Sequence, residues 1–176
     1  MMQMLAAGGV PILADGERRA DIDNPYGYFE WERIKQLPQE PALITEAEGK
    51  AVKVISQLLL SLPDGHEYRI IFMQRPLPEV LASQAEMLRH RGTGNPAAAD
   101  DAVMVKAFQN HLYEVNTSLT RRSDVKVQHV SYHRVLNETK TVAEEIAWFL
   151  GIPLDTDAMT RQADSSLYRQ RMTVDR

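Results

Sequence analysis

The stretch YRIIFMQRPLPEVLAS, residues 68–83, decides the fold, because an apolar, strand-like run ends in an arginine and passes directly into a helix. Arg75 stands where the strand should end, and Pro78 and Glu79 suit the first turn of the helix that follows. Ser83 lies about a turn and a half further along that helix. A guanidinium, a hydroxyl and a helix start that converge on one point are typical of a phosphate site. The stretch predicts an anion site, although a strand–helix junction with a surface arginine also fits these residues.

The composition is that of one soluble, globular domain. The chain has 176 residues, of which 44% are hydrophobic and 25% are charged. A net charge of -4 argues against a broadly basic, nucleic-acid-binding surface, so any anion site must be local. The sequence has no cysteine, which excludes disulfides and thiolate chemistry and fits a cytoplasmic protein. The longest apolar run is too short to span a bilayer, and the first residues lack the basic segment of a signal peptide, so no membrane partner is expected.

Strand-like and helix-like patterns alternate along the chain. Residues 1–7 predict a helix that Gly8 and Gly9 stop. Strands are expected at 10–13, 51–55, 69–73 and 125–130, and helices over 31–37, 77–88, 104–119 and 142–150. This order predicts a single α/β domain over residues 1–176 with a mainly parallel sheet. Ligands of such sheets bind beyond the carboxyl ends of the strands, which is where Arg75 lies.

Two further side chains occupy unusual places for their type. Lys53 lies inside an apolar, strand-like run, so it must reach a wet pocket or a partner, or else point to solvent from an edge strand. Tyr132 follows the strand that ends at residue 130. At this position it either belongs to a ligand-binding site or packs at the rim of the sheet. His129 and His133 are four residues apart but straddle the end of that strand, so they do not share a face as helical metal ligands do. No metal site is expected.

The Arg75 stretch resembles the 3′-phosphate loop of sulfotransferases that use 3′-phosphoadenosine 5′-phosphosulfate (PAPS). Arg75, Glu79, Val80 and Ser83 match the spacing of that loop, whereas Pro76 departs from it by following the arginine immediately. The resemblance implies a three-layer, P-loop-NTPase-like α/β fold. It also implies transfer of a sulfuryl group, without a metal, from PAPS to a hydroxyl or an amine of a small-molecule or glycan acceptor.

The same resemblance assigns roles to six side chains. Arg75 and Ser83 would hold the 3′-phosphate. Tyr132 would contact the adenine, and Lys53 would contact the sulfuryl oxygens. Either Glu17 or Glu30 would take the proton of the acceptor, and the sequence leaves the choice between them open. The basic tail that begins with SSLYRQR, residues 165–171, would approach the cofactor or remain solvated.

Besides Pro76, the sequence departs from the family at three places. The histidine that cytosolic members carry two residues after the lysine is replaced by Ile55, and the acidic pair after the tyrosine is replaced by His133 and Arg134. The family's first strand and its Arg-Ser-Gly-Thr-Ser loop are not found, so we expect a sheet without its first central strand and leave the activity of the chain open. A P-loop nucleoside or nucleotide kinase and a non-catalytic binding domain remain the alternatives.

Overall fold

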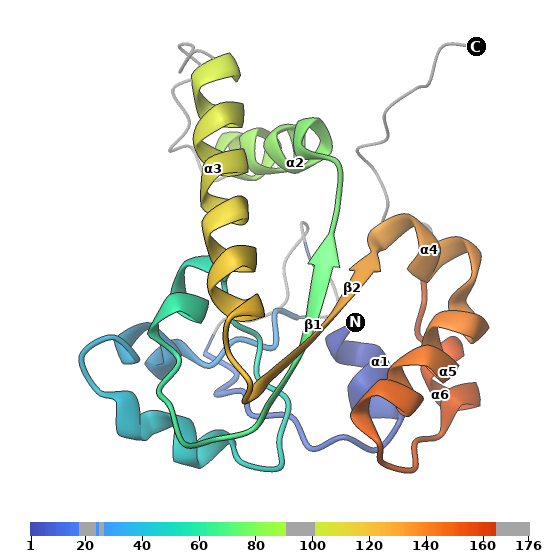
Figure 1. Ribbon diagram of the computed structural model, residues 1–176. Coiled ribbons are helices and arrows are strands. Elements are labelled where there is room, and N and C mark those ends of the chain that lie inside the picture. Colours follow the sequence, from blue (N-terminus) through green and yellow to red (C-terminus); the bar gives the residue numbers. More distant parts are fainter. Residues whose placement is uncertain (18–23, 25–26, 91–100, 165–176) are drawn as a thin grey trace.

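The chain is a mixed α/β protein with a small parallel sheet (Figure 1), and the computed structural model describes residues 1–17, 24, 27–90 and 101–164. Strand β1, Tyr68–Gln74, pairs in parallel with β2, Val125–Ser131. The register runs from Tyr68 opposite Val125 to Gln74 opposite Ser131. Because the strands are parallel and in step, their carboxyl ends lie side by side at one edge of the sheet.

The described helices include those predicted and four more, η2, η3, α4 and α6, that are not predicted from the sequence. The α-helices are α1 (Met2–Ala7), α2 (Leu77–His90), α3 (Asp101–Thr120), α4 (Tyr132–Asn137), α5 (Thr139–Leu150) and α6 (Thr156–Thr160). Three 3-10 helices, η1 (Glu32–Gln36), η2 (Pro41–Ala47) and η3 (Ser56–Ser61), precede the sheet in the chain. The predictions for α1, α2, α3, α5 and the two paired strands are confirmed, and the helix expected over 31–37 is the 3-10 helix η1.

Helices cover both faces of the sheet, and each face has its own apolar core (Figure 1). On one face, Ile71 and Val130 pack with side chains of α1, α4, α5 and α6. On the other face, Ile70 and Val127 pack with α3 and with the three 3-10 helices. Burial on both faces explains why both strands are rich in β-branched and apolar residues.

The strands expected at 10–13 and 51–55 are wrong apart from one residue pair. Ile12 and Ala51 form an isolated parallel bridge, in which the N–H of Leu13 donates to the Ala51 carbonyl at 3.0 Å. The ladder stays short because Pro11 has no N–H to donate and because η3 begins at Ser56. The hydrogen-bonded sheet of the described residues therefore has two strands, and Lys53 lies in an extended segment rather than in a strand.

The predicted end of helix α1 at Gly8 and Gly9 is confirmed, and Gly8 also has a packing role. A Cβ atom at Gly8 would lie 2.7 Å from Cγ of Met159, whose helix α6 packs against α1. Gly9 has a φ of 98°, a conformation that side chains with a Cβ rarely adopt. These two glycines let the amino-terminal helix meet α6 and turn away within two residues.

Arg122 ties the loop before β1 to the start of β2. Its guanidinium donates to the carbonyls of Leu62 (2.6 Å) and Pro63 (2.9 Å) and forms a two-point pair with Asp124. It also lies 5.4 Å from the ring centre of Tyr68. The Arg122 hydrogen bonds lower the pKa of Asp124, so this carboxylate stays charged as the pH falls.

We expect Arg122→Ala to lower the free energy of unfolding by about 2 kcal/mol, because it leaves two loop carbonyls and one carboxylate without their donor. Urea unfolding followed by circular dichroism measures this loss. Arg33→Ala is the matched control, because Arg33 forms an exposed pair with Glu46 that is worth less than about 1 kcal/mol. Equal losses for the two variants would show that the Arg122 contacts do not hold the loop.

Candidate functional site

Arg75 follows β1 directly and is bound by a buried carboxylate. Its Nε donates to Oε2 of Glu79 at 3.0 Å. Glu79 lies in the first turn of α2 and is only 2% exposed, which is rare for a glutamate unless it is paired. The helix begins here because the Pro76 carbonyl accepts the N–H groups of Glu79 and Val80. The turn after β1 thus buries an acid beside the predicted phosphate-binding arginine.

The carboxyl end of β2 brings one side chain to Arg75 and another to Glu79. Gln74 is opposite Ser131 in the sheet, so the residues that follow them, Arg75 and Tyr132, emerge next to each other. Cζ of Arg75 lies 5.2 Å from the ring centre of Tyr132, a cation–π distance. Nε2 of His133 lies 3.4 Å from Oε1 of Glu79, the oxygen on the other side of that carboxylate. We call Arg75, Glu79, Tyr132 and His133 the strand-end cluster.

The electrostatics of Tyr132 reflect this setting. Burial raises the pKa of the Tyr132 hydroxyl, the charge of Arg75 acts in the opposite direction, and the charges of Asp164 and Glu79 raise it further. The hydroxyl is therefore protonated at neutral pH. A neutral phenol ring beside a guanidinium offers an apolar face and a polar edge to a planar ligand.

Ser83 lies on the same stripe of α2 as the acid. It follows Glu79 by four residues and is partly buried, so the two side chains lie one above the other on one side of the helix. The structure thus places Ser83 one helical turn beyond the acid that binds Arg75.

Lys53 and Glu30 form the second group of predicted residues that the structure brings together. Nζ of Lys53 lies 3.1 Å from Oε1 of Glu30 and 3.1 Å from the carbonyl oxygen of Tyr28, and 5.6 Å from the ring centre of Tyr28. The lysine side chain is 40% exposed. Phe29, between the two partners, has a φ of 51°, a left-handed conformation that is uncommon for residues other than glycine. This turn lets the carbonyl and the carboxylate reach the same ammonium.

Glu17 lies in the neighbouring segment but not in this group of contacts. It is exposed, and its N–H donates to Oδ1 of Asp15, whose own N–H donates to the carbonyl of Glu30. The structure therefore pairs Glu30, rather than Glu17, with Lys53. The tail that begins at residue 165 lies outside the described residues.

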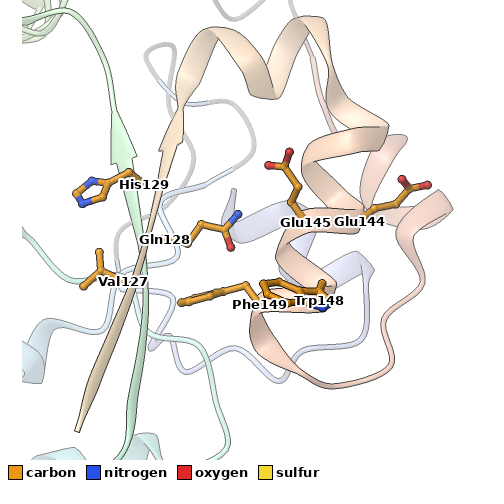
Figure 2. A pocket seen from close by; sticks show the side chains of 7 residues that line it. All are labelled: Val127, Gln128, His129, Glu144, Glu145, Trp148 and Phe149. Atoms are coloured by element: carbon orange, nitrogen blue, oxygen red, sulfur yellow. The ribbon is translucent and has the colours of Figure 1, made fainter. Parts of the chain in front are cut away.

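A groove of about 640 Å³ lies elsewhere, along β2 and α5 (Figure 2). Figure 2 shows Gln128 pointing toward α5, while Val127 and His129 point from the opposite face of the strand. Trp148, 86% exposed, and Phe149 line the groove on the α5 side. None of the six predicted site residues lines it, so this groove is separate from the predicted site.

No group of three or more histidine, aspartate or glutamate side chains in the described part of the chain is arranged to hold a metal ion. Within the same residues, every helix is too short or too polar to cross a lipid bilayer.

Comparison of the chain with protein-family models, with curated proteins and with solved structures gives no match. We therefore infer a function from the chemistry and geometry of the strand-end cluster and of the Lys53–Glu30 pair.

From the sequence, Glu79 is a position of the matching loop and His133 is a departure from the family, but neither residue is assigned a role in the site. Glu79 carried a signal, because an acid four residues after an arginine at a helix start faces it across one turn. His133 carried none, since its approach to Glu79 depends on the pairing of β1 with β2, which are separated by some fifty residues of chain.

We expect the pKa of Tyr132 to lie above the usual value of about 10 and to rise further in Arg75→Ala, because the guanidinium stabilises the phenolate that forms on ionisation. NMR titration of tyrosines labelled at Cζ measures this pKa. Arg33→Ala serves as the control and should leave it unchanged. A lower pKa in Arg75→Ala would contradict the placement of Arg75 beside the ring.

Proposed function

We propose that the chain is a sulfotransferase-like domain that binds PAPS at the carboxyl ends of β1 and β2 and transfers its sulfuryl group to an acceptor hydroxyl or amine. One observation carries this proposal: Arg75 and Tyr132 emerge next to each other where the two parallel strands end. A fixed cation beside an aromatic face suits a nucleotide that carries a phosphate close to its base.

The architecture supports the same proposal. Helices on both faces of a parallel sheet make up the three-layer arrangement of P-loop-NTPase-like folds, in which ligands bind beyond the carboxyl ends of the strands. Arg75 and Ser83 would contact the 3′-phosphate: Arg75 precedes the start of α2, and Ser83 lies one turn beyond Glu79 on the same side of that helix. A guanidinium has five N–H donors, so a carboxylate bound at Nε is compatible with phosphate contacts at the Nη groups.

The pair of Lys53 and Glu30 supplies the groups that the transfer needs. The bond between the sulfur and the bridging phosphate oxygen breaks, and a new bond forms between that sulfur and the acceptor oxygen or nitrogen. Lys53 would stabilise the negative charge that develops on the bridging oxygen, and Glu30 would take the proton that the acceptor loses. Transfer of this kind depends on positioning and on charge stabilisation more than on a covalent intermediate.

We expect Arg75→Ala to weaken binding of adenosine 3′,5′-bisphosphate by about 1.5–3 kcal/mol and to change binding of adenosine 5′-phosphate little, because only the first ligand has a 3′-phosphate. Isothermal titration calorimetry of both ligands measures the difference, with Arg33→Ala as the control arginine. Equal losses for the two ligands would overturn the assignment of Arg75. Tighter binding of ATP than of adenosine 3′,5′-bisphosphate by the unsubstituted protein would favour a kinase.

We expect Lys53→Met to retain the affinity for adenosine 3′,5′-bisphosphate but to slow sulfuryl transfer from PAPS by about 10²–10³-fold. The reason is that the variant lacks the positive charge that would stabilise the negative charge developing on the bridging oxygen. Chromatography of the nucleotide products, with a panel of hydroxyl and amine acceptors, measures the rate. Lys35→Met is the control, because Lys35 is an exposed lysine paired with Glu32. A rate unchanged by Lys53→Met would make Lys53 structural, and binding without any turnover would favour the non-catalytic binding domain.

A further inference from the structure

The buried Glu79 carboxylate is the least expected charge in the described structure. It is 2% exposed, and it is held by Arg75 at Oε2 and faced by His133 at Oε1. Burying a carboxylate is unfavourable unless donors surround it. A carboxylate also repels phosphate, so an acid at an anion site needs a reason beyond its charge.

We propose that Glu79 is a positioning residue for the anion site: it fixes Arg75 and His133 in one preformed arrangement that faces the 3′-phosphate. This inference rests on the proposed function. Arg75 has a long, flexible side chain and follows the last residue of a strand, while Pro76 removes the backbone donor that would come next. A carboxylate that binds Nε directs the remaining edge of the planar guanidinium away from itself.

The three elements that meet at Glu79 explain how the arrangement is held. The carboxylate comes from the first turn of α2, Arg75 comes from the end of β1, and His133 comes from the first turn of α4, which follows β2. Glu79 therefore links the ends of both strands through its two oxygens. A ligand that meets side chains already fixed loses less conformational entropy on binding.

Three readings of Glu79 predict different results for Glu79→Gln, a change that keeps the shape and removes the charge. If the carboxylate acts only by its charge, its loss should tighten phosphate binding. If it is only a structural partner of Arg75, the variant should melt at a lower temperature and lose affinity equally for ligands with and without a 3′-phosphate. Positioning predicts a selective loss for the ligand that has the 3′-phosphate.

The test compares the dissociation constants of adenosine 3′,5′-bisphosphate and adenosine 5′-phosphate by calorimetry, and their ratio is the selectivity for the 3′-phosphate. We expect Glu79→Gln to reduce this selectivity about tenfold. In the Arg75→Ala background the same change should reduce it no further, because Glu79 acts through Arg75. Glu86→Gln is the control on the same helix, since Glu86 forms an exposed pair with Arg89, and it should leave the selectivity unchanged.

A second measurement does not depend on the folding of any variant. In the unsubstituted, ligand-free protein, the Nε–H of Arg75 should give a protected NMR signal, and adding adenosine 3′,5′-bisphosphate should leave its exchange rate nearly unchanged. An Nε–H signal that becomes protected only when ligand is added would overturn the positioning role. So would an unchanged or increased selectivity for the 3′-phosphate in Glu79→Gln. If the unsubstituted protein binds neither nucleotide, the proposed function fails and the positioning role fails with it.

Discussion

The register between β1 and β2 is the constraint on which the candidate site depends. Seven residue pairs run in step from Tyr68 opposite Val125 to Gln74 opposite Ser131. A shift by one residue would turn every side chain of a strand to the other face of the sheet, and the two faces pack here against different cores. The packing of two apolar cores therefore fixes the register, and the register places Arg75 beside Tyr132.

Much of this arrangement could be predicted from the sequence, because the signals are local. The apolar run before Arg75 predicts β1, and the helical spacing of apolar residues after it predicts α2. The alternation of apolar and polar residues at 125–130 predicts β2. The extended segments around Ile12 and Ala51 were predicted as strands from composition alone. Apolar, β-branched residues indicate burial, and Val10, Ile12 and Val54 do pack in the two cores. Such residues do not ensure a hydrogen-bonded ladder, which Pro11 and η3 interrupt.

The composition of the site was harder to predict than its location. Residue types pointed to Arg75, Lys53 and Tyr132, whereas the partners of these side chains come from distant parts of the chain. Lys53 meets Glu30 across more than twenty residues, and the left-handed turn at Phe29 that makes this contact has no sequence signal, since a phenylalanine is rarely found there. The sequence left Glu17 and Glu30 equivalent because their difference lies in the three-dimensional path of this turn.

Pairing of the two cations determines how a ligand would be recognised. The protein has a net charge of -4, and both Arg75 and Lys53 are bound by carboxylates. Each pair is nearly neutral when seen from a distance, and at physiological ionic strength charges are screened beyond about 8 Å. Long-range attraction of the proposed nucleotide would therefore be weak, and its recognition would rest on directional hydrogen bonds formed at contact. This is the situation in which the orientation of a guanidinium matters more than its charge, and it gives a physical reason to bury a carboxylate such as Glu79 beside an anion site.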